Sequence, residues 1–227
     1  MKTFIDKLYR SRFLGTIFHT LDYCLQKELK NCESVLDLGC GPSSPLQYCK
    51  NVKHSVGVEA FTDYLNRSKK SEIHTEYLNK NIKDVNFPND SFDAVIFIEV
   101  LEHLTENEGM QILEKAGNWA KKKIIVTSPN GFINQKEVDN NPLQKHLSGW
   151  DYKKMRKMGF KIRGLAGLKF LRQEGQSDVM EGELLHSIRF RPKSFWFLAA
   201  ALSQIFTYWF PSIAYELLSV KKKQQSK

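Results

Sequence analysis

The sequence of 227 residues has little cysteine, and its cysteines are not spaced for a metal cluster. Cys24, Cys32, Cys40 and Cys49 form no Cys-x-x-Cys pair and have no ladder of histidines beside them, which argues against a zinc cluster and a disulfide framework. Residues 1–20 also lack the long apolar core of a secretory signal, because charged residues interrupt them. We therefore expect reduced thiols and a cytoplasmic protein.

Acidic residues are the scarcer charged class. The 34 Lys and Arg outnumber the 25 Asp and Glu and give a formal net charge of +9. Such an excess suits nucleic acid, an anionic membrane surface or an acidic substrate, or it forms a solvated basic face. The sequence has no recognised nucleic-acid module, so nucleic acid is the least favoured partner. With 41% hydrophobic residues, the chain 1–227 is expected to fold as a single domain.

A third glycine is missing from the most informative stretch, residues 34–45, which read SVLDLGCGPSSP. Its apolar first half, interrupted by Asp37, predicts a buried parallel strand, and Gly39 and Gly41 predict a tight turn that brings the backbone close to a ligand. A strand, a glycine turn and a short helix form the doubly wound arrangement that binds nucleoside-bearing cofactors. Ser44 replaces the third glycine of the dinucleotide motif, and the Asp37 carboxylate would repel a pyrophosphate but attract an ammonium or sulfonium group. An NAD-dependent dehydrogenase is therefore the disfavoured alternative.

Acidic side chains also follow two later apolar runs. Residues 54–58 (HSVGV) predict a strand that ends at Glu59, where a carboxylate can accept hydrogen bonds from ribose hydroxyls. Residues 92–98 (FDAVIFI) predict a buried strand that ends at Glu99, shortly before Glu102 and His103. A capping box at 105–108 (TENE) then begins a helix. This alternation predicts a parallel sheet whose carboxyl edge gathers the acidic side chains.

The stretch VLDLGCG at 35–41 resembles the first motif of the class I SAM-dependent methyltransferases, where SAM is S-adenosylmethionine. The resemblance extends with specific motifs over residues 35–164. It implies a Rossmann-like α/β fold, doubly wound, with a mostly parallel seven-stranded sheet and an antiparallel last strand. It also implies SAM as the cofactor, bound by Asp37, Gly39, Cys40, Gly41, Glu59, Ala60, Asn81, Ile82 and Glu99. Asn81 stands where the family has an adenine-contacting Asp, and Asp84 is the alternative if the register is shifted.

Two histidines are candidates for removing a proton from the methyl acceptor. His146 lies in a long polar loop over residues 132–147 and is the preferred base, with a merely hydrogen-bonded loop histidine as the equal alternative. The segment EVLEH at 99–103 resembles the metal-binding element of ubiquinone-biosynthesis and small-RNA 2′-O-methyltransferases. That resemblance makes Glu99, Glu102, His103 and His146 candidate ligands of a divalent metal. Similar motifs occur in metal-free methyltransferases, and the metal-free interpretation is favoured.

The two ends of the chain resemble the family only in architecture. Residues 1–30 predict amphipathic helices, 148–151 (SGWD) a second capping box, 160–165 a strand and 167–192 an insertion or cap over the pocket. Residues 194–210 predict a very apolar helix, followed by a last strand over 213–220. Its apolar run, residues 195–210, would rise about 24 Å as a helix, which is less than the roughly 30 Å hydrocarbon core of a bilayer. A buried helix is favoured, and contact with a membrane surface or a membrane span are the alternatives.

The leading functional hypothesis is a SAM-dependent methyltransferase that acts on a hydroxyl of a small molecule, lipid or glycan. The alternative is a non-catalytic SAM-binding protein that docks on membranes through its basic, aromatic C-terminal segment. The sequence does not identify the acceptor or the oligomeric state.

Overall fold

The computed structural model describes residues 12–173 and 187–223. Its strands are β1 (Ser34–Leu38), β2 (His54–Val58), β3 (Glu76–Leu78), β4 (Phe92–Ile98), β5 (Ala120–Pro129), β6 (Lys161–Leu168) and β7 (Ala214–Lys222). Its helices are α2 (Arg12–Phe18), α3 (Leu21–Glu28), α4 (Thr62–Lys70), α5 (Glu106–Trp119), α6 (Tyr152–Lys157) and α7 (Lys193–Thr207). Residues 174–186, within the predicted insertion, lie outside the described residues.

The seven strands form one sheet in the order β3-β2-β1-β4-β5-β7-β6. Strands β1 to β5 pair in parallel, whereas β7 runs antiparallel to both β5 and β6. The predicted fold class is confirmed, including the antiparallel last strand. The strand order reverses between β1 and β4, so the loops after these strands diverge and leave a crevice at their carboxyl ends.

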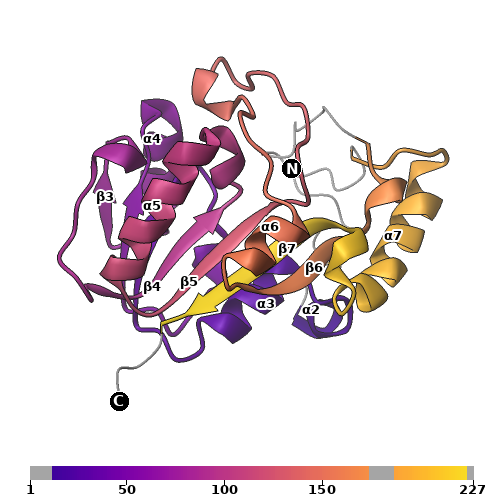
Figure 1. Ribbon diagram of the computed structural model, residues 1–227, viewed down its shortest axis with the longest axis horizontal. Helices are drawn as coiled ribbons and strands as arrows, with labels where there is room; N and C mark the ends of the chain where they lie inside the picture. Colours follow the sequence, from indigo (N-terminus) through magenta and orange to yellow (C-terminus); the bar gives the residue numbers. More distant parts are fainter. Residues whose placement is uncertain (1–11, 174–186, 224–227) are drawn as a thin grey trace.

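Both faces of the sheet are covered, which explains the nearly continuous apolar sequence of the central strands. Leu36 and Leu38 of β1 join the core on the side of α5, together with Ile112. Val35 points to the opposite face and packs in the core that contains Leu25 of α3. Figure 1 shows α5 and α6 in front of the sheet and α3 behind it. Burying each such side chain stabilises the fold by roughly 1.5–3 kcal/mol.

The helix expected after the glycine turn is only a short 3₁₀ segment, Pro45–Tyr48, which the hydroxyl of Ser44 caps through the amide of Leu46. The predicted capping box at 105–108 is confirmed: Thr105 and Glu108 bond reciprocally at the start of α5. The second predicted box is wrong, because Asp151 rather than Ser148 caps α6, through the amide of Lys154.

The C-terminal region differs in one respect from its prediction. β7 occupies the place of the expected last strand, and α7 precedes it beside β6 (Figure 1). The helix is not buried, however, since only one side, with Phe197, Ala200 and Gln204, faces the protein. No helix within the described ranges is both long and apolar enough to span a membrane.

Candidate active site

A cavity of about 460 Å³ lies at the carboxyl ends of β1, β2 and β4. The cavity is within the size range of small-molecule sites. Its lining includes every candidate residue that the sequence suggested, namely Asp37, Gly39, Cys40, Gly41, Glu59, Ala60, Asn81, Ile82, Glu99, Glu102, His103 and His146. Asp84, the alternative to Asn81, is not in the lining. The fold therefore brings residues from five separate segments of the chain to one pocket.

The glycine turn follows β1 directly and is fixed from both sides. The amides of Gly39 and Cys40 donate to the carbonyl of Val58, at 2.8 and 3.0 Å. Gly39 has φ +71°, and a Cβ atom there would lie 2.7 Å from a methyl carbon of Val100. Only glycine fits this position without strain, because L-residues rarely adopt positive φ and the space is already filled.

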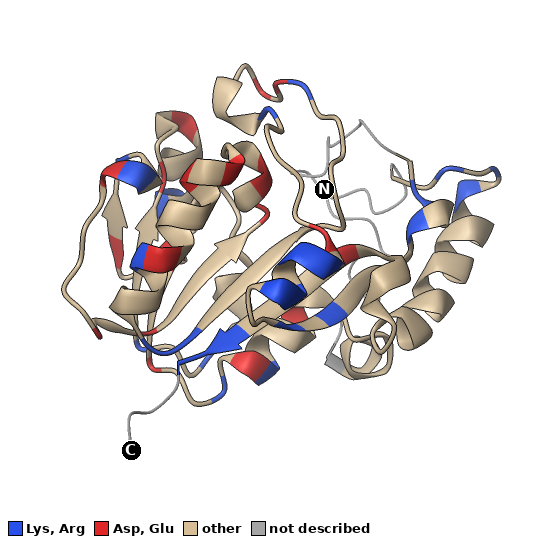
Figure 2. Ribbon diagram, in the orientation of Figure 1, with Lys and Arg blue, Asp and Glu red and all other residues tan. Residues whose placement is uncertain are grey.

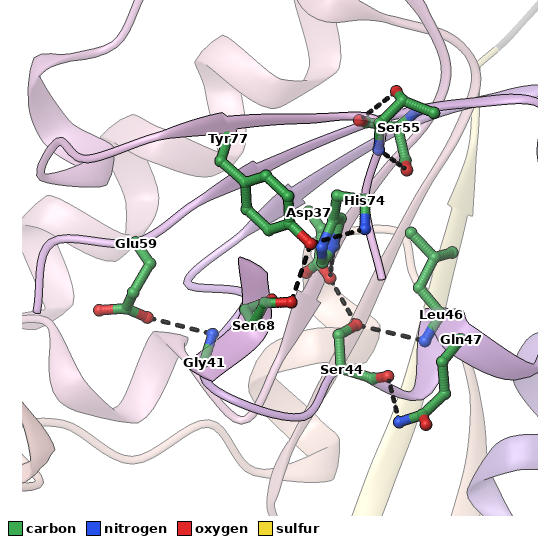
Figure 3. A network of polar contacts seen from close by, with 11 residues as sticks. Asp37, Gly41, Ser44, Leu46, Gln47, Ser55, Glu59, Ser68, His74 and Tyr77 are labelled. Carbon is green, nitrogen blue, oxygen red and sulfur yellow. Dashed lines mark hydrogen bonds and ion pairs between the residues drawn. The ribbon is translucent and has the colours of Figure 1, made fainter. Parts of the chain in front are cut away.

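Asp37 lies behind the turn in a buried polar network, which Figure 3 shows. One of its carboxylate oxygens, Oδ2, accepts a hydrogen bond from Ser44 Oγ and lies 3.0 Å from His74 Nε2. The side chains of His74 and Asp37 are 0% and 1% exposed. Tyr77 extends the network, since its hydroxyl accepts from the backbone amide of His74 and donates to the carbonyl of Ser68.

This network gives Asp37 a role that the sequence did not suggest. Its carboxylate holds both the glycine turn and the segment before β3, while its second oxygen, Oδ1, has no hydrogen-bond partner among the described residues. His74 was missed because its partner is 37 residues away in the sequence and no local pattern marks a pairing of this kind.

Glu59 bridges the first two loops of the pocket. Its carboxylate accepts from the amide of Gly41 at 3.1 Å (Figure 3). It also accepts from the amide of Phe61 at 2.8 Å. Burial raises the pKa of Glu59, and the two amide hydrogen bonds partly oppose this effect. A carboxylate held in this way can still accept hydrogen bonds from ligand hydroxyls, because each oxygen has more than one acceptor position.

Asn81 and Ile82 form the side of the pocket after β3. Asn81 caps the 3₁₀ segment Ile82–Asp84, and its side-chain oxygen accepts from the amide of Lys83 at 3.0 Å. The oxygen therefore has a structural use, and the NH₂ group of Asn81 is the part suited to a ligand acceptor.

Two buried carboxyl groups follow β4. Glu99 has φ +54°, and its amide donates to the carbonyl and the hydroxyl of Thr127. Oε1 of Glu99 and both carboxyl oxygens of Glu102 are buried without a hydrogen-bond partner among the residues described. Burial raises the pKa of both groups, and the proximity of Glu99 raises that of Glu102 further. Buried acids of this kind favour either a bound cation or a retained proton.

The rings of His103 and His146 contact each other edge to face, with their centroids 4.8 Å apart. Each Nδ1 lies near a backbone carbonyl, that of Lys145 for His103 (3.3 Å) and that of Ile133 for His146 (2.8 Å). Because a carbonyl can only accept, Nδ1 carries the proton in both rings, and each neutral ring keeps a lone pair on Nε2. Burial lowers the pKa of both histidines. The pKa of His103 falls to about 4, because the neighbouring His146 also disfavours the charged form of His103.

Three of the four candidate metal ligands gather in one place. Ligand atoms of Glu102, His103 and His146 all lie within 4.8 Å of one another, whereas Glu99 is not part of this group. One carboxylate and two neutral imidazoles are ligands that divalent transition metals accept. One of the two imidazoles could instead accept a proton, with the other two side chains beside it.

His146 is held by a loop that is anchored to the segment after β4. The amides of Leu147 and Ser148 donate to the carbonyl of Glu102. The indole N–H of Trp150, which is fully buried, donates to the carbonyl of Leu101 at 3.0 Å and to Ser148 Oγ at 2.8 Å. Ser148 thus stabilises the loop and does not cap α6.

Comparison with known proteins supports the assignment of the fold. Residues 36–123 match the family described as "Methyltransferase domain". The match spans the glycine turn, Glu59, Asn81 and the segment from Glu99 to His103. The matched part of the chain, residues 36–123, is therefore similar to the class I SAM-dependent methyltransferases.

Individual relatives of this methyltransferase are distant. It is 24% identical over 188 residues to an uncharacterized protein of Methanocaldococcus jannaschii, covering 69% of this chain and 72% of that protein. It is 29% identical over 110 residues to (S)-coclaurine N-methyltransferase of Thalictrum flavum, covering 44% of this chain but only 29% of the plant enzyme. In structure it resembles a SAM-dependent methyltransferase from Archaeoglobus fulgidus, with a TM-score of 0.54, 16% identity and coverage of 93% and 98% of the two chains.

The pocket fits SAM, the cofactor that the similarity to methyltransferases implies. At Gly39 and Gly41 the turn brings backbone without side chains to the cavity, and both glycines have positive φ. Asp37, Glu99 and Glu102 each have a carboxyl oxygen without a hydrogen-bond partner among the described residues, and in the ionised form these groups would match a sulfonium and an ammonium group.

Proposed function

We propose that this methyltransferase transfers a methyl group to a hydroxyl of a small-molecule, lipid or glycan acceptor, with His146 as the base. The observation that carries the proposal is the neutral imidazole of His146, whose Nδ1 donates to the carbonyl of Ile133 and whose Nε2 keeps its lone pair beside the cavity. SAM, when bound, supplies a methyl group that the sulfonium charge activates for in-line displacement. The protein has to align the two reactants and, for a hydroxyl acceptor, remove one proton.

The cofactor contacts that we assign follow from the geometry of each group. Glu59 accepts hydrogen bonds from the ribose hydroxyls with a carboxylate that two amides already orient. Asn81 and the backbone amide of Ile82 contact the adenine, since both line the side of the pocket after β3. Gly39, Cys40 and Gly41 allow close approach of the backbone, flanked by Ala60. Asp37 and Glu99 attract the cationic end.

In the catalytic step, Nε2 of His146 accepts the acceptor's proton. A pKa below the ordinary histidine value keeps this nitrogen unprotonated at neutral pH. The carboxyl of Glu102 lies beside the ring, where it can stabilise the imidazolium that forms. His103 contributes to the same cluster through its own uncharged ring.

A divalent metal at Glu102, His103 and His146 is the second candidate for activating the hydroxyl, because these three side chains offer ligand atoms within 4.8 Å of one another. A bound metal would lower the pKa of the acceptor hydroxyl and replace His146 as the activating group. Full activity after treatment with a chelator would exclude this second candidate. Loss of activity that added metal restores would exclude His146 as the base.

The proposal is tested by incubating the protein with methyl-labelled SAM and a fractionated cell extract. We expect label in a small-molecule, lipid or glycan fraction, in a linkage that survives mild alkali as an ether does. Label confined to protein or RNA, or label on nitrogen, would contradict the proposed acceptor. SAM binding without transfer to any fraction would favour the non-catalytic alternative.

A further inference from the structure

The outer side of α7 exposes a continuous apolar stripe. Its residues are three or four positions apart, so they lie on one face of the helix. Phe195, Leu198, Leu202 and Phe206 are exposed by 60%, 54%, 53% and 51%, and Trp209, which lies just after the end of α7, is exposed by 58%. The inner side of the same helix packs on β6. The stripe is therefore a second apolar face of a helix whose other face already contributes to the core.

Helix α2 and the residues after α7 enlarge this surface. Phe13 and Ile17, one helical turn apart on α2, are 74% and 39% exposed, and α2 contacts α7. We call the combined surface the α2–α7 face; it consists of Phe13, Ile17, Phe195, Leu198, Leu202, Ile205, Phe206, Trp209, Phe210 and Ile213. Exposed apolar side chains gathered on contacting elements in this number mark a site of interaction.

Among the described residues, the charge on α2 and along residues 187–215 has one sign. Residues 187–215 contain Arg189, Arg191 and Lys193 and no Asp or Glu, and α2 likewise has no acidic residue. Figure 2 shows basic residues at the start of α7 and no acidic residue along the helix. Just beyond the C-terminal end of α7, the guanidinium of Arg163 lies over the ring of Trp209, 4.5 Å from its centroid. The face is thus matched in charge to an anionic partner.

We propose that the α2–α7 face docks on the surface of an anionic lipid bilayer, with α7 lying parallel to the membrane. Aromatic and aliphatic side chains beside arginine and lysine are the composition of helices that lie in the interface, where apolar groups enter the acyl region and cations meet the headgroups. The 15 residues of α7 measure about 22 Å, which suits a helix lying on the membrane rather than crossing it.

Docking through this face places the catalytic pocket near the bilayer. Gln204, on the inner side of α7, and His19, at the end of α2, both line the cavity. The docked helices are therefore the same elements that form one wall of the pocket. The docking itself does not depend on which acceptor the enzyme methylates.

The test is sedimentation of the whole protein with vesicles of phosphatidylcholine alone and of phosphatidylcholine mixed with phosphatidylserine. We expect binding to the mixed vesicles that weakens at high salt and is much weaker with phosphatidylcholine alone. Leu202→Glu should reduce the binding constant roughly tenfold or more, because a carboxylate replaces a leucine that enters the acyl region. The double substitution Arg189→Gln and Arg191→Gln should reduce it by a similar factor, mainly at low salt.

Matched controls lie on the opposite part of the molecule. Met110→Glu on α5, where the methionine is 44% exposed, and Lys69→Gln with Lys70→Gln on α4 should leave vesicle binding unchanged. No binding to either vesicle type, or an equal loss in the variants and their controls, would overturn the proposal. A dimer in solution that Leu202→Glu dissociates, without vesicle binding by the wild-type protein, would identify a second copy as the occupant and would also overturn it.

Discussion

At the scale of single residues, Glu59 combines burial with a position at the cofactor pocket. Its pKa is raised because the carboxyl is removed from water. Only the ionised form can accept hydrogen bonds with both oxygens, so SAM affinity should fall as the pH falls through this raised pKa, at a pH above the ordinary range of glutamate. Titration calorimetry of SAM at a series of pH values measures the midpoint. Glu59→Gln should weaken binding and remove this pH dependence, whereas Glu114→Gln, exposed on α5, should change neither.

The second residue-scale prediction concerns His146. His146→Ala should lower kcat roughly 10²–10⁴-fold if the imidazole is the base. The dissociation constant of SAM should change little, because the assigned cofactor contacts lie in other loops. A loss of SAM affinity together with a lower melting temperature, at nearly unchanged kcat, would instead indicate a structural role. The measurement requires kcat and SAM affinity on the same preparation.

At the scale of elements, the loop that holds His146 depends on Trp150. Trp150→Phe removes the indole N–H that bonds to Leu101 and Ser148 and leaves a small cavity, which should cost about 1–2 kcal/mol of unfolding free energy. The loop that holds His146 should also become less well placed, so kcat should fall. Urea denaturation and kinetics of the variant measure both effects.

The matched control for Trp150→Phe is Trp119→Phe. Trp119 is also buried, but it packs against Phe87 at the end of α5, away from the loop that holds His146. The Trp119→Phe variant should have a lower free energy of unfolding, because its ring is smaller, while its kcat stays unchanged. Equal kcat in the two variants would show that Trp150 does not position the loop.

The same elements show where sequence reasoning succeeds and where it does not. The capping box at Thr105 and the glycine turn at Gly39 are local, because the atoms that define them lie within a few residues, and both could be predicted. Ser148 matched the pattern of a cap, yet its hydroxyl bonds to the carbonyl of Leu101, 47 residues away. The pairing of His74 with Asp37 is equally non-local. The apolar composition of 194–210 predicted a helix but could not indicate which of its faces would be buried.

At the scale of the whole molecule, the sheet assembles the site at the strand-order reversal between β1 and β4. Asp37 lies near the end of β1, and Glu59 and Glu99 directly follow the neighbouring parallel strands β2 and β4. Their side chains therefore reach one cavity although they are far apart in sequence. The sequence could predict this gathering because parallel strands share a carboxyl edge. The sequence could not predict that α2, α7 and β7 would form a further wall of the pocket.

The central claim is that SAM binds at the glycine turn of this pocket, and titration calorimetry with two glycine variants tests it most directly. Gly39→Ala forces a Cβ into a positive-φ turn, 2.7 Å from Val100, and should weaken SAM binding by at least about tenfold. Gly117→Ala adds the same methyl group within α5, where its nearest contact would be Ile124 at 3.9 Å, and should leave SAM binding unchanged. Wild-type protein that binds no SAM, or a Gly39→Ala variant that binds it as tightly as Gly117→Ala, would contradict the account.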